Sequence, residues 1–178
     1  YVGLYVLGGL SSSRLDNIFV RQDKTAVSVG ASVAPYEKVS IVDIAVNVKD
    51  GVDPATVAAK LDTVIADYLQ KGPTADEVQR AATQIAAGQI SGLEQVGGFG
   101  GKAVTLAEGA VYSNDPDRYK KDLAALAAVT PASATAALRK WLGRPGYRLL
   151  VSPGERTEKD MAAAGVDIVI ARGGKPLV

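Results

Sequence analysis

The fold of this chain is decided by the stretch Leu7-Gly8-Gly9-Leu10-Ser11-Ser12-Ser13-Arg14-Leu15, continued by Phe19-Val20-Arg21-Gln22-Asp23-Lys24-Thr25-Ala26-Val27-Ser28-Val29-Gly30-Ala31. The paired glycines are typical of a helix end. The three serines can cap a second helix over about Ser12–Arg21, with Leu15, Ile18 and Phe19 on one face. Alternation of small and β-branched residues from Thr25 to Pro35 then predicts a strand.

A second alternating run follows at Val39–Lys49. Its apolar residues share one face and its polar residues the other, and in the first strand Val27, Val29, Ala31 and Val33 are expected on one side. The short connection Pro35–Lys38 between the two runs favours an antiparallel pair with one solvated face.

Helix signals follow the strands. Asp53-Pro54 is typical of an N-cap followed by the first helical residue, and Gly72-Pro73 ends that helix. Thr74–Glu77 has the pattern of a capping box for a helix over about Ala75–Leu93. The remaining expected elements are a helix over about Lys102–Tyr112, a helix restarting at Asp115-Pro116, a helix from Thr130-Pro131 to Gly143 with Ala134, Leu138, Trp141 and Leu142 inward, and a closing strand at Tyr147–Val151.

This order predicts an α+β fold, an antiparallel sheet covered on one face by helices. We expect one domain over residues 1–152 and a tail or linker over residues 153–178. Because Tyr1–Leu7 has the pattern of the last turns of a helix, the domain is expected to lack its N-terminal part.

Composition narrows the possible functions. The 178 residues hold 20 Lys or Arg and 19 Asp or Glu, so the net charge of +1 gives no electrostatic case for nucleic acid. No apolar run is long enough to span a membrane. The chain has no histidine and no cysteine, which excludes thiolate catalysis and any zinc site built from these ligands.

Three local patterns could suggest chemistry, and each has a simpler explanation. The cluster Gly97–Gly101 follows a helical pattern rather than a strand, so a helix break explains it better than a phosphate loop. A nucleophile among Ser11–Ser13 would need Lys24 or Lys102 as its base, and no spacing brings them together. Tyr112, Tyr119, Trp141 and Tyr147 are expected in the core or at its rim rather than as a stacking platform.

The opening stretch resembles the "GG–SSRL … VR–K–A–SV–A" signature of the pitrilysin/insulinase-type zinc metallopeptidases, whose members carry H-x-x-E-H in their metal-binding domain. Further segments are similar to that family in the same order: Val48–Pro54, Lys71–Val78, Asp115-Pro116, Val129–Pro131, Lys140–Leu142 and Tyr147–Glu155. The resemblance covers about residues 2–156. It implies the non-metal-binding, C-terminal type of domain, bacterial in type, with the metalloenzyme (LuxS/processing-peptidase-like) fold.

In that family the non-metal half often carries an Arg and, seven residues later, a Tyr that hold the substrate backbone. Aligned on Ala26–Ser28, this chain has Val27 at the tyrosine position and Arg21 six residues before it. Arg21 is therefore the one candidate substrate contact that the resemblance implies, with a solvated cation at a helix end as the alternative. No catalytic residue and no metal ligand are expected in this chain.

The resemblance implies the non-catalytic half of a zinc-dependent endopeptidase. The half would enclose a peptide substrate and pair with a zinc-bearing H-x-x-E-H domain or subunit elsewhere, in the periplasm or cell envelope of a bacterium by analogy. This chain alone would be inactive and hold no cofactor. Two alternatives stay open: a structural or assembly subunit of the same family, and an unrelated ligand-binding α+β module, because a fold does not fix a function.

Overall fold

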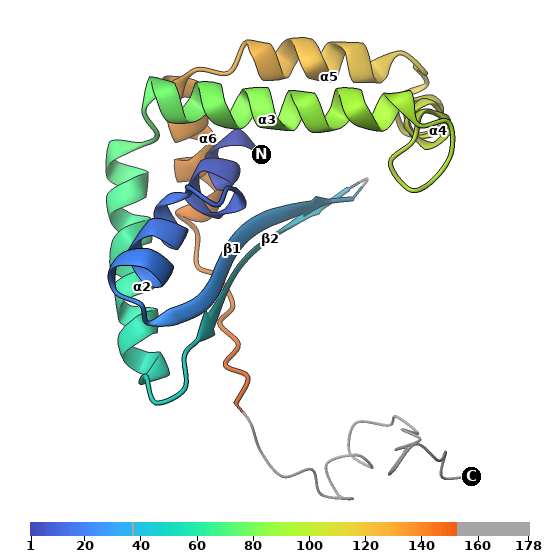
Figure 1. The fold of residues 1–178 in the computed structure, drawn as a ribbon. Helices are drawn as coiled ribbons and strands as arrows, with labels where there is room; N and C mark the ends of the chain where they lie inside the picture. Colours follow the sequence, from blue (N-terminus) through green and yellow to red (C-terminus); the bar gives the residue numbers. More distant parts are fainter. Residues whose placement is uncertain (37, 153–178) are drawn as a thin grey trace, which may run out of the picture. The chain divides into compact units, whose positions relative to one another are not determined.

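The computed structural model describes residues 1–36 and 38–152. The chain divides into two compact units, Tyr1–Pro145 and Gly146–Val178, and the predicted domain boundary at residue 152 stays a prediction. The helices and strands of the described residues belong to the first unit (Figure 1). With η marking a π-helix, they are α1 (Val2–Leu4), η1 (Tyr5–Gly9), η2 (Asp16–Gln22), β1 (Ala26–Pro35), β2 (Ser40–Val48), α2 (Pro54–Lys71), α3 (Ala75–Glu94), α4 (Lys102–Ser113), α5 (Arg118–Ala127) and α6 (Pro131–Leu142).

The two strands form the antiparallel hairpin that the alternation predicts. Opposite pairs such as Val29 and Val46, or Ala31 and Ile44, put their side chains on one face. That face packs against η1 and η2, so the α+β prediction of a sheet with helices on one face is confirmed.

Val27 does not share the face predicted for it. The pairing register shifts between Ala26 and Ser28, as a β-bulge requires, and the extra residue reverses the alternation at this point. Ala26 is therefore fully buried, whereas Val27 is 65% exposed.

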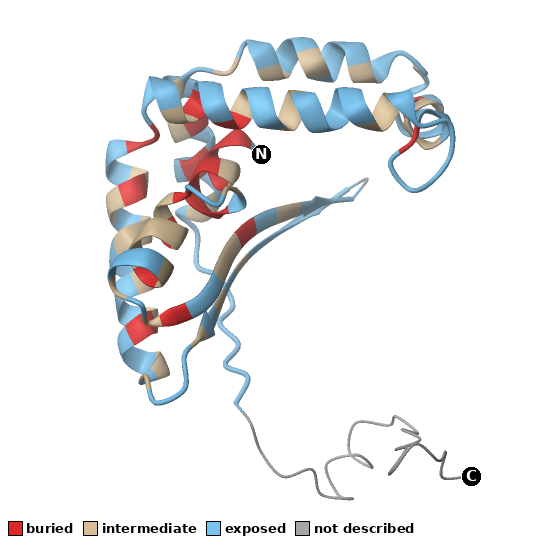
Figure 2. Cartoon of the chain, viewed as in Figure 1, coloured by how far each residue is buried: buried red, intermediate tan, exposed pale blue. Residues whose placement is uncertain are grey.

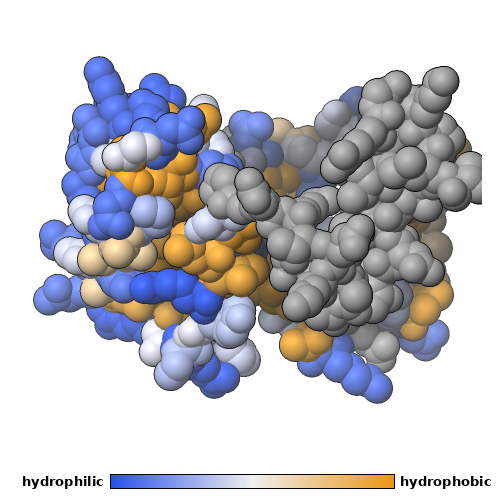
Figure 3. All heavy atoms as spheres, turned by 90° about the horizontal axis from the view of Figure 1, so that it is seen from below, coloured by the Kyte–Doolittle hydropathy of each residue, from blue (hydrophilic) through white to orange (hydrophobic). Residues whose placement is uncertain are grey.

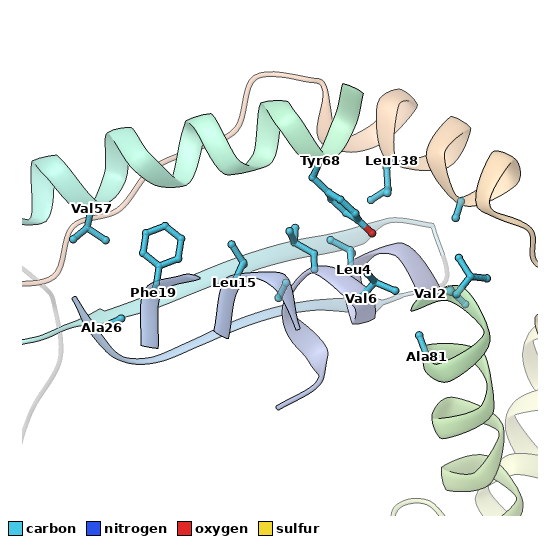
Figure 4. Packing of buried hydrophobic residues seen from close by; sticks show 14 residues of the cluster. Val2, Leu4, Val6, Leu15, Phe19, Ala26, Val57, Tyr68, Ala81 and Leu138 are labelled. Atoms are coloured by element: carbon cyan, nitrogen blue, oxygen red, sulfur yellow. The ribbon is translucent and has the colours of Figure 1, made fainter. Parts of the chain in front are cut away.

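The core lies where the short helices meet the hairpin and the long helices. Figure 4 shows Leu15, which directly precedes η2, and Phe19 of η2 between the hairpin behind and α2, which contributes Val57 and Tyr68. In Figure 2 the buried residues gather on the N-terminal segment and on the facing parts of α2, α3 and α6. The predicted apolar face of Leu15, Ile18 and Phe19 is confirmed, since Leu15 and Phe19 are completely buried and Ile18 packs against the core. Among the described residues, the buried apolar residues are Val2, Leu4, Val6, Leu7, Leu15, Phe19, Ala26, Ala31, Val57, Tyr68, Val78, Ala81, Ala134 and Leu138.

Gly8 makes the closest approach between η1 and the sheet. A Cβ atom on this residue would lie 2.5 Å from the backbone nitrogen of Ala31 and 2.7 Å from its Cβ. No side chain fits there, because both of the atoms that it would meet are fixed by strand β1. The Gly-Gly pair therefore ends a helix, as predicted, and also lets that helix rest on the hairpin.

The helix ends follow the capping chemistry of the sequence. The Asp53 carboxylate accepts hydrogen bonds from the backbone nitrogens of Ala55 (3.1 Å) and Thr56 (2.9 Å) at the start of α2. The predicted capping box of α3 is present, and Gly72 takes a φ of +72° between the two helices. Thr130 caps α6 in the same way, so the predicted starts of these helices are confirmed.

Two predictions about buried apolar residues are wrong. Trp141 lies three residues after Leu138 and seven after Ala134, so it shares their helical face, yet it is 58% exposed whereas both of them are buried. Tyr147–Val151 forms no strand: no backbone pairing runs along it, and a strand exists only through pairing with a neighbour. Its apolar side chains are exposed. Figure 3, seen from below, shows orange apolar patches among the blue hydrophilic surface.

Candidate substrate-contact site

The segment from Ser11 to Val27 carries the only site residue that the sequence singles out, and it contains two arginines with different surroundings. The first, Arg14, reaches across to the junction of α2 and α3. Its Nε atom donates to Oε1 of Glu77 at 2.8 Å, and Nη2 donates to Oε2 at 2.7 Å. Nη2 also lies 3.1 Å from the carbonyl oxygen of Gly72, and the guanidinium stacks 4.8 Å from the ring centroid of Tyr68.

This arrangement changes the titration of both partners. The hydrogen bonds from Arg14, more than the burial that opposes them, lower the pKa of Glu77 to about 2. Burial raises the pKa of the Tyr68 phenol, whose hydroxyl donates to the carbonyl oxygen of Gly3 at 2.8 Å. Arg14 thus joins the N-terminal segment to the bend between the two long helices, which is a structural role.

The second arginine, Arg21, lies on the exposed side of η2. A π-helix brings residues five apart into line, because its hydrogen bonds run from i to i+5. Asp16 is five residues before Arg21, and its Oδ2 atom accepts from the Nε of Arg21 at 2.7 Å. The Nη2 atom of the same guanidinium donates to the carbonyl oxygen of Ser11 at 2.6 Å.

This helix differs from the one predicted over about Ser12–Arg21, because only Arg14 and Leu15 are α-helical before the π-helix begins. The Arg21 side chain is 60% exposed, so solvent reaches it in spite of its two partners. The structure therefore places the predicted substrate contact on the surface, joined to its own segment. Val27, at the aligned tyrosine position, is exposed on the bulge of β1.

An open groove of about 420 Å³ lies between η2 and α2, beside the first arginine. Its floor is apolar and its rim carries one cation and one carboxylate. The lining residues are Arg14, Asn17, Ile18, Thr63, Val64 and Asp67. Arg21 is not among them, so the groove and the predicted contact are separate features.

The other chemical candidates have structural explanations. Ser13 is buried, and its Oγ atom accepts from the backbone nitrogen of Asp16 at 3.4 Å, which confirms the capping interpretation. The glycine cluster follows helix α3 rather than a strand, and Gly101 is the N-cap residue of α4. A phosphate loop of the nucleotide-binding kind is therefore wrong for this chain, and the helix break is confirmed.

The described residues do not fit a zinc ion. Among them, no three carboxylate, histidine or cysteine side chains come close enough together to hold a metal. The sequence itself offers no histidine or cysteine for such a site. Within residues 1–36 and 38–152, no helix is long and apolar enough to cross a membrane.

Sequence reasoning missed the role of Arg14. Both halves of the pair were visible, since Arg14 belongs to the "SSRL" motif and Glu77 to the capping box. They are 63 positions apart, however, and no local pattern joins them. Only the packing of η2 on α2 brings the two side chains together.

Comparison with known proteins shows what this chain resembles. Residues 1–85 match the family model described as the peptidase M16 inactive domain. None of the curated protein sequences matches the chain.

Solved structures share the fold. An inactive peptidase domain from Bordetella parapertussis, taken from a candidate zinc protease, superposes with a TM-score of 0.70 at 16% identity, over 88% of this chain and 83% of that one. The peptidase M16 inactive domain from Pseudomonas fluorescens gives a TM-score of 0.63 at 20% identity, over 78% of this chain and 32% of that one.

A protease from Helicobacter pylori gives a TM-score of 0.68 at 13% identity, over 79% of this chain. The aligned part is 33% of the Helicobacter pylori chain, so this chain corresponds to about a third of its length. At these identities the likeness shows the fold alone. Together, the family-model match over residues 1–85 and the shared fold confirm the resemblance to the non-metal-binding, inactive domain of the M16 (pitrilysin/insulinase-type) peptidases.

Proposed function

We propose that this chain is the non-catalytic half of a zinc-dependent endopeptidase. In this role it encloses a peptide substrate and pairs with a zinc-bearing H-x-x-E-H domain, in the same polypeptide or in a separate subunit. The observation that carries the proposal is the inactive-domain match over residues 1–85, and it agrees with the described residues, among which no three potential metal ligands cluster. The periplasm or cell envelope of a bacterium is the proposed location.

The contribution of this half is architectural. Zinc, held by the partner domain, would activate the attacking water. The residues of this chain would wall off the substrate and exclude bulk water from it, which strengthens the electrostatic interactions inside such a chamber. Arg21 is the proposed contact with the peptide, since its guanidinium is exposed and can exchange the carbonyl oxygen of Ser11 for a peptide carbonyl.

The test begins with the reading frame that encodes this chain and its neighbour, in which H-x-x-E-H should be found. The assembled protein should cleave a quenched fluorescent peptide, lose that activity with a zinc chelator and regain it with added zinc. The zinc-bearing half alone should be much less active than the pair. An assembled protein that has the motif and yet cleaves no peptide would contradict the proposal.

One observation favours a second candidate, a structural or assembly subunit of the same family. The position aligned with the substrate-binding tyrosine is Val27, and Arg21 is already joined to Asp16 and Ser11. A reading frame and neighbour without H-x-x-E-H, together with stable association of this chain with another subunit, would support this candidate over the peptidase.

A further inference from the structure

Positive charge gathers at the end of α6, beside an exposed tryptophan. Residues 139–144 contain three Lys or Arg and no acidic residue, although the whole chain has a net charge of only +1. Trp141 is the single tryptophan of the chain and is 58% exposed. A large apolar ring and several cations therefore share one small area of surface.

Two of these cations are held against the indole ring. The Nζ atom of Lys140 lies 5.1 Å from the ring centroid of Trp141, and the Cζ atom of Arg144 lies 4.6 Å from it. Both distances are within the range of a cation–π interaction, in which the negative face of the ring attracts the charge. Trp141, expected in the core or at its rim, therefore also provides a ring face that two cations contact.

These cations differ from most others on the described surface. Eight described Lys or Arg side chains form an ion pair with a carboxylate. Lys140 and Arg144 form none with any carboxylate of residues 1–36 and 38–152. No carboxylate of the described residues therefore neutralises their charge.

The neighbouring Arg139 has a structural explanation. Its Nε atom donates to the carbonyl oxygen of Leu69 at 2.7 Å, and its Nη2 atom donates to that of Gln70 at 2.7 Å. These carbonyls belong to the last turn of α2, where a cation also complements the helix dipole. Arg139 holds α6 against α2, so the available positive charge is that of Lys140 and Arg144.

We infer that Lys140, Trp141 and Arg144 form a docking surface for an acidic segment of a partner polypeptide. Carboxylates of that segment meet the two cations, and an apolar side chain of it lies on the exposed indole. Trp and Arg are the residue types that most often dominate the binding energy of protein interfaces.

The small number of cations on this surface favours an acidic polypeptide segment over nucleic acid and over an anionic membrane. Nucleic acid binding draws its affinity from many phosphate contacts along a stripe of cations. Attraction to an anionic bilayer takes clusters of about four to eight basic residues. Two cations on one aromatic ring match two or three carboxylates instead.

The experiment uses the full 178-residue chain and the fluorescence of its single tryptophan. The probe is a decapeptide with five glutamates and one phenylalanine, titrated beside the same peptide with glutamine at the five positions. The acidic peptide should shift the emission of Trp141 in a saturable way, and binding should weaken as salt is raised. An unchanged emission, or an equal response to the glutamine peptide, would overturn the inference.

A matched pair of variants separates this surface from general electrostatics. Lys140→Gln with Arg144→Gln should weaken the acidic peptide about tenfold, since two charge-assisted contacts are lost. Lys120→Gln with Lys121→Gln removes the same charge from α5 and should change the affinity less than about twofold. An equal loss in both pairs overturns the inference. So does tighter binding of a single-stranded oligonucleotide, or of vesicles with anionic lipid, to the unmodified chain.

Discussion

Arg14 and Arg21 lie seven positions apart in one segment, and the structure uses them in opposite ways. Arg14 is bound by groups from α2 and α3, and its side chain is 23% exposed. Arg21 is bound by its own segment, through Asp16 and Ser11, and its side chain is 60% exposed. The first arginine is needed to build the domain, whereas the second can be replaced without disturbing the packing.

The difference comes from the distance along the chain that each contact spans. The pair of Arg14 with Glu77 closes a long loop and fixes the N-terminal segment against the bend of α2 and α3. The pair of Arg21 with Asp16 joins two residues on successive turns of the same π-helix. A long-range, partly buried pair therefore contributes to the fold, and a local, exposed pair leaves its cation available to a ligand.

The largest expected effect is that of Arg14→Met. It keeps the apolar length of the side chain on Tyr68 but leaves the Glu77 carboxylate partly buried without its cation. We expect the free energy of unfolding to fall by about 2–3 kcal/mol, measured by urea denaturation. Arg80→Met, which breaks an exposed pair with Asp76 on the same α3 helix, should cost less than about 0.5 kcal/mol. Equal losses in the two variants would contradict the distinction.

The second prediction concerns acid. The pKa of Glu77 is about 2 in the fold, below the ordinary value of 4.5, so the folded state binds its proton less readily than the unfolded state. The resulting stabilisation is complete above pH 4.5 and is lost as the pH falls from there toward 2. It is on the order of 2 kcal/mol.

Glu77→Gln should therefore make the free energy of unfolding fall less steeply between pH 5 and pH 2. The free energy of unfolding is measured at intervals of roughly half a pH unit. Glu94→Gln changes an exposed carboxylate on the same helix and should keep the profile of the unmodified chain. If the free energy of unfolding falls as steeply with pH in Glu77→Gln as in Glu94→Gln, Arg14 does not lower the pKa of Glu77.

A smaller effect is expected at the aromatic partner of Arg14. Tyr68→Phe keeps the ring under the guanidinium and removes only the hydroxyl that donates to the carbonyl oxygen of Gly3. Loss of this buried hydrogen bond should lower the free energy of unfolding by about 1–2 kcal/mol in thermal or urea denaturation. Tyr112→Phe, at a 64% exposed ring, should have almost no effect. If both variants behave alike, the bond to Gly3 adds nothing to the anchoring of the N-terminal segment.

Local chemistry made most of the fold predictable, and packing decided the rest. Alternation predicted both strands, and the caps at Asp53, Thr74 and Thr130 predicted where three helices begin. The bulge that exposes Val27 could not be predicted, because Val27 continues the apolar alternation of Val29 and Ala31 in the sequence although the backbone register shifts beside it.

The candidate site was less predictable than the fold. Arg21 was found only through its place in a family motif, and the π-helix that pairs it with Asp16 has no sequence signal comparable to a cap. The contacts of Arg14 and the cations on Trp141 depend on how helices pack, which residue spacing alone does not specify.

The smallest effect on stability, and the most informative for function, is expected from Arg21→Ala. An exposed ion pair of this kind contributes about 0–1 kcal/mol, so the free energy of unfolding should change by less than about 0.5 kcal/mol. If Arg21 contacts the peptide, the same variant should raise the KM of the assembled peptidase about fivefold with little change in kcat, since it removes binding to the substrate rather than chemistry.

Lys60→Ala is the matched control, because Lys60 also forms an exposed pair, with Asp23, and carries the same charge. It should change neither quantity. Asp16→Asn sharpens the test, since it weakens the ion pair that holds Arg21 against its own segment and should lower KM if the guanidinium moves from that segment to the peptide. A KM that is unchanged in both Arg21→Ala and Asp16→Asn would show that Arg21 is a surface cation without a role in substrate binding. The segment that most resembles the family would then supply no single side-chain contact to the peptide backbone.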